Sequence, residues 1–170
     1  RVPVIRALID AEIPVMGHLG LTPQSLHAMG GYRVQGKEGH HAIRLLEDAL
    51  RLQEAGCFAL VLEGIPAELA ERVTASLEIP TIGIGAGAGC SGQVLVFHDL
   101  LGILPGKGAK FVRKYLDGYG LMVDAMSAWA ADVRGGGFPA AAESYMLPEA
   151  TRKLLSTWQP PAHTETESTD

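Results

Sequence analysis

Titratable side chains stand at the ends of three apolar segments of this sequence. They are His18, Glu63, and the neighbours His98 and Asp99. If these segments are parallel strands, their carboxyl ends meet at one edge of a sheet, where α/β proteins gather their active-site groups. A histidine and a glutamate in one pocket can divide the work of removing a proton and holding an oxyanion.

Glu63 follows a strongly apolar run. In Phe58–Pro66 (FALVLEGIP), five apolar residues lead directly into the acid, and Gly64 and Pro66 then turn the chain. A short apolar run bounded by turn residues predicts a strand buried on both faces, as in parallel sheets. Glu63 could instead cap the following helix, because the helix dipole favours an anion at the N-terminus. Position alone leaves both interpretations open.

The histidines also have structural interpretations. A single histidine at a strand end, such as His18, is more often a core residue bonded to a loop carbonyl than a ligand. His98 and Asp99 are expected to fix the turn into the next segment. His40 and His41 lie in a polar loop and are expected to be solvated.

A glycine-rich stretch follows the predicted third strand. Gly83, Gly85 and Gly87 form G-x-G-x-G, which lacks both the spacing of a dinucleotide-binding loop and its ribose-reading acid. These glycines therefore predict only a close approach of the backbone to a ligand. Cys57 is expected to be a small buried residue. Cys90 lies within the glycine stretch, and no histidine near it in sequence would activate its thiol.

Composition restricts the class of protein. The chain has 170 residues, 47% hydrophobic and 19% charged, which suits one soluble domain or part of a larger one. A net charge of -5 without a basic stripe argues against nucleic acid as a partner. We expect no signal peptide and no membrane span. Two cysteines form no disulfide framework, which favours a reducing cytoplasm.

Apolar periodicity predicts a helix followed by four strand–helix units. The predicted strands are Ile13–Gly20, Phe58–Glu63, Ile79–Gly85 and Gln93–Asp99. The predicted helices are Arg1–Glu12, Ala42–Ala55, Pro66–Leu77, Phe111–Leu116, Leu121–Arg134 and Pro148–Trp158. Such alternation indicates a parallel sheet with right-handed crossovers.

Four strand–helix units are half of a (βα)₈ barrel, which typically needs ~250 residues. The sequence therefore predicts the second half of a barrel over residues 1–147, with an open four-stranded sheet as the alternative. A terminal helix is expected over 148–161. A polar, disordered tail is expected over 162–170.

Four segments resemble the ketopantoate hydroxymethyltransferase family. They are Ile13–Ser25 (IPVMGHLGLTPQS), Gly30–Gly36 (GGYRVQG), Leu60–Pro66 (LVLEGIP) and Ile82–Asp99 (IGIGAGAGCSGQVLVFHD). The similarity runs in order through most of the chain, to about Pro148. The motif G-H-L-G-L-T-P-Q is far more specific than any glycine motif.

The resemblance implies a (βα)₈ TIM barrel of the phosphoenolpyruvate mutase/isocitrate lyase type, of which the chain carries about strands 5–8. It implies transfer of a hydroxymethyl group from 5,10-methylenetetrahydrofolate to 3-methyl-2-oxobutanoate, with Mg²⁺ stabilising the enolate. Glu63 matches the proton-accepting glutamate of the family, and His18 matches a histidine that contacts the keto acid. A cytoplasmic homo-oligomer is expected.

The sequence departs from the family pattern in several places. The family's Mg²⁺ ligands and a substrate-binding lysine lie upstream of the part that matches Arg1–Glu12, so no metal ligand is expected in this chain. Gly64 stands where a cysteine is common, and Ser91 stands where an acid is common. Two alternatives therefore remain: an inactive half-barrel that assembles with a partner or with itself, and a related carbon–carbon lyase or mutase.

Overall fold

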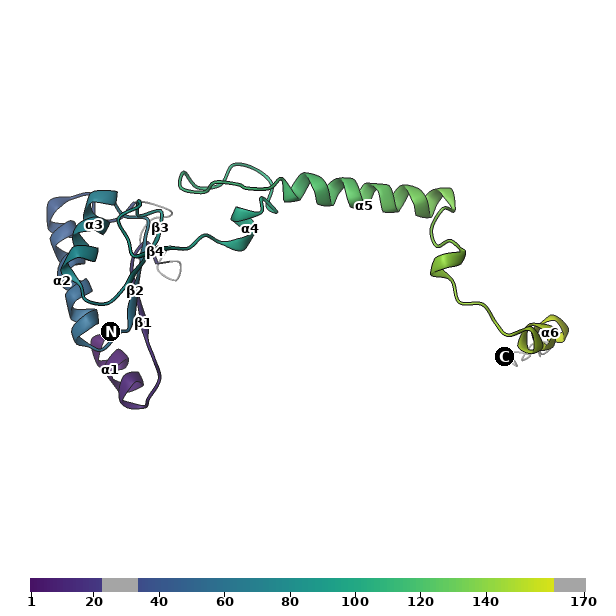
Figure 1. The fold of residues 1–170 in the computed structure, drawn as a ribbon, viewed down its shortest axis with the longest axis horizontal. Coiled ribbons are helices and arrows are strands. Elements are labelled where there is room, and N and C mark those ends of the chain that lie inside the picture. The colour runs from purple at the N-terminus through teal and green to yellow at the C-terminus, as the bar shows by residue number, and fades with distance from the viewer. Residues whose placement is uncertain (23–33, 161–170) are drawn as a thin grey trace, which may run out of the picture. The chain divides into compact units, whose positions relative to one another are not determined.

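The structure is a computed structural model that describes residues 1–22 and 34–160. Its elements are α1 (Val2–Asp10), β1 (Met16–Gly20), α2 (Gly39–Glu54), β2 (Ala59–Glu63), α3 (Ala67–Ser76), β3 (Thr81–Ile84), β4 (Gly92–Gln93), α4 (Phe97–Leu100), α5 (Gly118–Gly135), the 3₁₀ helix η2 (Ala141–Glu143) and α6 (Glu149–Thr157) (Figure 1). The chain divides into two compact units, Arg1–Gly120 and Leu121–Asp170. The first unit contains all of these strands. None of the described helices has the length and apolar character that a membrane span requires.

The strands form one parallel sheet in the order β1-β2-β3-β4. Helix α2 connects β1 to β2, and α3 connects β2 to β3. Strands that are neighbours in sequence are therefore neighbours in space, with helical crossovers between the first three. This arrangement confirms the predicted α/β class with a parallel sheet.

The hydrophobic core lies on one face of β2. Leu60 and Leu62 are fully buried, and they pack against α2 and α3 through Leu45, Ala49, Leu69, Ala70 and Val73. Figure 1 shows both helices on the same side of the sheet. Because side chains alternate along a strand, Val61 and Glu63 face the other way, and both are only half-buried. The prediction of a strand buried on both faces is thus only partly correct, since α2 and α3 cover one face.

Two predicted elements are wrong. Instead of a strand over Gln93–Asp99, only Gly92 and Gln93 pair with β3, and Phe97–Leu100 forms the short helix α4. Beyond Gln93 the β-prone residues have no paired ladder, and the amide of Leu100 closes a helical turn onto the carbonyl of Val96. The local apolar pattern predicts a strand, but local propensity is not enough to extend the strand beyond the residues that pair with β3.

The segment Phe111–Leu116 is irregular rather than helical. The ring of Phe111 lies against Gly85, and the amide of Tyr115 donates to the carbonyl of Leu100 at 2.8 Å. A helix this short is marginal on its own, so these tertiary contacts determine its conformation.

The remaining helices and strands are confirmed, with ends that differ by a few residues. Gly56, with a φ of 98°, follows the end of α2 as predicted. Helix α2 begins at Gly39, so the neighbouring histidines 40 and 41 belong to its first turn and not to the preceding loop. Residues 23–25 of the segment Ile13–Ser25, residues 30–33 of the segment Gly30–Gly36, and the tail 162–170 lie outside the described residues. The predicted division of the chain into a half-barrel (1–147), a terminal helix (148–161) and a tail (162–170) stays a prediction.

Candidate active site

His18 and Glu63 meet on one face of the sheet. Gly20 of β1 pairs with Glu63 of β2, and His18 stands two residues before Gly20. Residues two apart on a strand share a face, so the two side chains are diagonal neighbours across the ladder. His18 Nε2 lies 3.1 Å from Glu63 Oε2. The side chains therefore converge as the sequence predicted, while the chemical role of each stays a prediction.

The imidazole of His18 has unused bonding capacity. Its Nε2 atom is buried, and it has no hydrogen-bond partner within residues 1–22 and 34–160. The 3.1 Å approach to Glu63 is thus a close contact without hydrogen-bond alignment. A buried polar atom left unsatisfied costs about 1–3 kcal/mol. An imidazole nitrogen without a hydrogen-bond partner, beside a carboxylate, is well suited to form a hydrogen bond with an oxygen atom of a ligand.

Backbone contacts hold Glu63 at the end of β2. Its carbonyl accepts a hydrogen bond from the amide of Leu21 at 2.8 Å. Gly20 has a φ of 92°, and a Cβ atom at this position would collide with the carbonyl oxygen of Glu63. Only glycine combines this conformation with so close an approach of two strand ends. Gly20, the second glycine of the G-H-L-G motif, therefore allows the end of β1 to lie against the peptide of Glu63.

The side chain of Glu63 does not cap α3. Helix α3 has Pro66 as its N-cap residue and no side-chain hydrogen bond there, and Glu68 is the acid in its first turn. The capping interpretation is therefore wrong. Glu63 is directed to His18 instead, and only 14% of its side chain is exposed.

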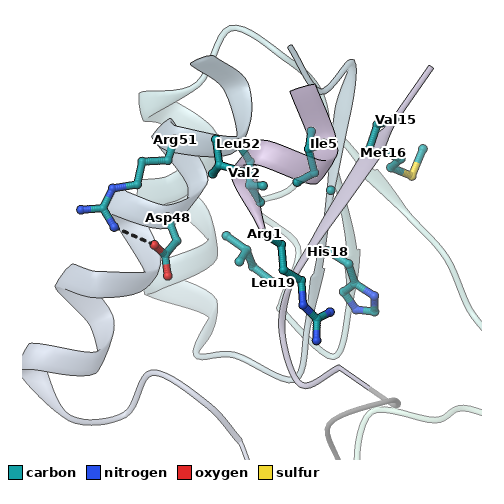
Figure 2. Close-up of a pocket in the computed structure, with 11 residues that line it drawn as sticks. Arg1, Val2, Ile5, Val15, Met16, His18, Leu19, Asp48, Arg51 and Leu52 are labelled. Atoms are coloured by element: carbon teal, nitrogen blue, oxygen red, sulfur yellow. Dashed lines mark hydrogen bonds and ion pairs between the residues drawn. The ribbon is translucent and has the colours of Figure 1, made fainter. Parts of the chain in front are cut away.

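His18 lines two cavities along β1, of about 440 and 430 Å³. The first also contains Arg1 and the Asp48–Arg51 pair, whose Oδ1 and Nη1 atoms are 3.0 Å apart (Figure 2). The second contains Arg1 and Arg44. Guanidinium groups beside an imidazole favour an anion such as a small carboxylate. Glu63 is not among the described residues that line either cavity.

The three glycines after β3 are closely surrounded by protein. An added Cβ would meet Cys90 and Gln93 at Gly83, the ring of Phe111 at Gly85, and Ala67 at Gly87. Gly85 and Gly87 also line a cavity of about 600 Å³ together with Gly64. Packing alone therefore requires small residues here, and the approach of a ligand to this loop stays a prediction.

Ser91 ties the glycine-rich stretch to the start of β3. Its hydroxyl accepts a hydrogen bond from the amide of Thr81, and its amide donates to the hydroxyl of Thr81, both at 3.2 Å. The Thr81 hydroxyl is fully buried and also lies 2.8 Å from that of Thr74. Ser91 thus supplies a local bond that accounts for a serine at this position.

The other singled-out residues lie outside the His18–Glu63 contact. His98 and Asp99 are in α4 rather than at a strand end, since the fourth strand stops at Gln93. Cys57 is buried as expected, and burial raises the pKa of its thiol. Cys90 is half-buried, and both cysteines are free thiols.

Sequence reasoning missed one cluster. His40 and His41 are solvent-exposed as expected, but they converge on Glu38 at the start of α2. These are the only three neighbouring His, Cys, Asp or Glu side chains in the described part of the chain that could hold one metal ion. The E-x-H-H spacing just before a helix was the signal that could have indicated the cluster.

A family model described as ketopantoate hydroxymethyltransferase matches residues 1–141. The chain is 62% identical over 164 residues to the 3-methyl-2-oxobutanoate hydroxymethyltransferase 2 of Bradyrhizobium diazoefficiens, a match that covers 96% of the chain and 56% of that relative. It is 66% identical over 155 residues to the 3-methyl-2-oxobutanoate hydroxymethyltransferase of Methylobacterium sp. (strain 4-46), covering 91% and 54%. The enzyme of that name from Nitratidesulfovibrio vulgaris is 59% identical over 143 residues, covering 84% and 47%. The chain thus spans about half the length of the curated relatives it matches.

Proposed function

Because the chain belongs to the ketopantoate hydroxymethyltransferase family, we propose that this protein transfers a hydroxymethyl group from 5,10-methylenetetrahydrofolate to 3-methyl-2-oxobutanoate. The product is 2-dehydropantoate, an intermediate of pantothenate biosynthesis. The observation that carries the proposal is the approach of His18 Nε2 to Glu63 Oε2 at 3.1 Å.

In the proposed reaction, Glu63 is the general base. Its carboxylate takes the proton from C3 of the keto acid, the electron pair of the broken C–H bond forms the C2–C3 double bond, and the π pair of the C2 carbonyl moves to its oxygen, which gives an enolate. His18 donates a hydrogen bond to an oxygen of the keto acid through Nε2, the buried atom without a hydrogen-bond partner among the described residues. One water molecule hydrolyses the two C–N bonds of the methylene bridge, which releases tetrahydrofolate and leaves the one-carbon unit as formaldehyde. C3 of the enolate then attacks the formaldehyde carbon, and the resulting alkoxide takes up a proton to become the hydroxymethyl group. Partial burial of both side chains supports these roles, since charges interact more strongly where water is excluded.

When bound, Mg²⁺ would supply Lewis-acid chemistry to the proposed activity. The described residues do not fit this ion. Mg²⁺ prefers carboxylate and water oxygens, whereas the metal-ligand group in the described part of the chain has two imidazoles and one carboxylate. We place the Mg²⁺ ligands in the half of the family barrel that the chain does not span.

For the fold, we propose that these four strands are strands 5–8 of a (βα)₈ barrel. Two observations support this assignment. The strand order follows the chain without reversal, as in a barrel and unlike a doubly wound sheet. The core with α2 and α3 lies on one face, while His18 and Glu63 share the other, which would be the barrel interior.

We further propose a homo-oligomer in the cytoplasm. Helix α5 carries exposed apolar side chains at spacings of four, three and four residues, namely Met122, Met126, Trp129 and Val133. Such a stripe on one side of a helix is suited to packing against another chain. The two free thiols, Cys57 and Cys90, agree with a reducing compartment.

The proposal is tested by exchange of the C3 proton of 3-methyl-2-oxobutanoate with deuterated water, catalysed by the complete enzyme with Mg²⁺ and without folate. Glu63→Gln keeps the side-chain volume and removes the base, so we expect exchange to fall by at least about 100-fold. Glu68→Gln is the matched control, since this exposed acid in the first turn of α3 has no proposed role. Exchange by Glu63→Gln at the rate of the Glu68→Gln control would refute the assignment.

A further inference from the structure

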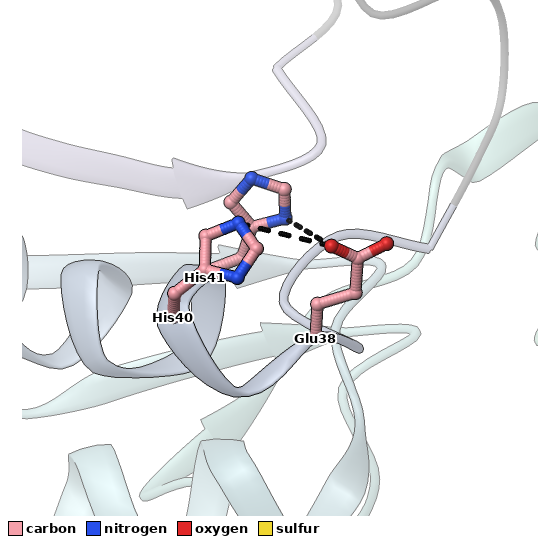
Figure 3. A group of neighbouring side chains, drawn as sticks. All are labelled: Glu38, His40 and His41. Carbon is pink, nitrogen blue, oxygen red and sulfur yellow. Dashed lines mark ion pairs between the residues drawn. The ribbon is translucent and has the colours of Figure 1, made fainter.

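Three potential metal ligands converge at the start of α2. Glu38 Oε2 lies 3.7 Å from His40 Nε2 and 3.8 Å from His41 Nδ1 (Figure 3). The three ligand atoms all lie within 4.8 Å of one another. Ligand atoms around a tetrahedral Zn²⁺ ion, with bonds of about 2.0–2.1 Å, are separated by about 3.3 Å. Small rotations of these exposed side chains are therefore enough to close them around one ion.

The backbone at the start of α2 fixes the Cα positions of Glu38, His40 and His41. Glu38 is the N-cap residue of α2, and its carbonyl accepts the hydrogen bond of the Ala42 amide at 2.9 Å. His40 and His41 follow in the first helical turn, and their ring centroids are 4.0 Å apart. The cluster is thus anchored to a regular element, which lowers the conformational entropy lost when an ion binds.

Ion pairing by itself is a weak reason for this arrangement. Exposed pairs between histidine and glutamate contribute little to stability, because water screens their charges. Imidazole nitrogen is, by contrast, a common ligand of transition-metal ions.

We propose that Glu38, His40 and His41 form a surface site for one divalent transition-metal ion, of the class of Zn²⁺, Cu²⁺ and Ni²⁺. Imidazole nitrogen suits these ions, whereas Mg²⁺ prefers a shell of oxygen ligands. Three protein ligands leave a coordination position for water, so the ion is exchangeable rather than structural. The site shares no residue with the His18–Glu63 pair, and its ligands differ from those that Mg²⁺ prefers.

The site adjoins the region of His18. His41 lines the same cavity of about 430 Å³ as His18, Gly20 and Arg44. An ion held by His41 would therefore add positive charge at the wall of that cavity. Binding of an ion at this site would therefore change the electrostatic potential around His18.

The test is calorimetric titration of the complete protein, without a histidine tag, with ZnCl₂ in the presence of excess Mg²⁺. We expect one Zn²⁺ per chain that Mg²⁺ does not displace. His40→Ala, His41→Ala and Glu38→Gln should each weaken this binding by at least about tenfold. His98→Ala is the matched control, because His98 is also exposed on a helix but lies outside the cluster.

A second measurement separates coordination from loose association. Co²⁺ in place of Zn²⁺ should give the visible absorption bands of a low-coordinate site, and these bands should be lost in His40→Ala and His41→Ala. All three ligands are exposed, so the thermal unfolding temperature of the metal-free variants should match that of the wild type. Zn²⁺ binding that is equal in the wild type and in the His40→Ala and His41→Ala variants would overturn the proposal. Loss of binding in His98→Ala would overturn it as well.

Discussion

Replacement of Gly20 by alanine tests the close contact between the end of β1 and the peptide of Glu63. Two features of Gly20 oppose a side chain. Its φ of 92° lies in the region that favours glycine, and a Cβ atom would collide with the carbonyl oxygen of Glu63. The same Cβ would also lie 2.7 Å from Cγ2 of Ile65, which is buried. Relief of these contacts requires a shift of backbone, not merely of a flexible side chain.

The expected loss of stability combines both features. A positive φ costs a residue with a Cβ about 1–2 kcal/mol. Forcing an atom into a filled space costs about 1–3 kcal/mol more. We therefore expect Gly20→Ala to lower the free energy of unfolding by about 3 kcal/mol. With a urea dependence of about 2 kcal/mol per molar, the midpoint of unfolding should fall by about 1–2 M.

Two other glycines separate the contributions in the same urea titration, followed by far-UV circular dichroism. Gly106 has a φ of 87° but nothing within 4 Å of an added Cβ, so Gly106→Ala should show the backbone term alone, about 1 kcal/mol. Gly39 has neither a positive φ nor a close neighbour and lies at the start of α2, so Gly39→Ala should leave stability unchanged or slightly raised.

The order of the three midpoints decides the outcome. If Gly20→Ala unfolds at the same urea concentration as Gly106→Ala, the contact with Glu63 does not restrict the site. If it unfolds at the concentration of Gly39→Ala, the reasoning about both φ and close approach is refuted.

Two further predictions concern residues around β2 and β3. Thr81→Val should lower the free energy of unfolding by about 1–3 kcal/mol, because it leaves the amide of Ser91 without its acceptor. Thr157→Val, at an exposed position, should change the free energy of unfolding by less than about 0.5 kcal/mol. Equal urea midpoints for the two variants would contradict this prediction. Burial raises the pKa of the Cys57 thiol, so less thiolate is present at any given pH. Alkylation of Cys57 by iodoacetamide, measured by peptide mass spectrometry, should therefore be slow at pH 8 and faster only at higher pH. Fast labelling at pH 8 would contradict the burial of Cys57.

Local sequence predicted most of the elements, because their signals act over short distances. The apolar run before Glu63 and the helical periodicity of Ala42–Ala55 each depend on neighbouring residues, and each gave an element close to the observed one. Alternation of strands and helices was enough to predict a parallel sheet, because such connections restrict the topology. Motifs of residue type were enough to indicate the family.

Prediction failed where a neighbour in space decided the conformation. Gln93–Asp99 has the composition of a strand, yet its ladder ends at Gln93 and α4 follows. Phe111–Leu116 has a helical pattern, yet the packing of Phe111 on Gly85 and the bond from Tyr115 to Leu100 hold it in an irregular path. The free-energy differences that underlie helix and strand propensity are smaller than the contributions of such tertiary contacts.

The sequence by itself identified His18 and Glu63 as candidates for chemistry and placed them on two successive strands. Only the tertiary structure decided how they are paired, because pairing depends on the register between strands that are distant in sequence. The register that sets Gly20 opposite Glu63 directs the carboxylate to His18 instead of to the N-terminus of α3. The turn into α2 likewise gathers Glu38, His40 and His41, which the sequence shows only as a polar loop.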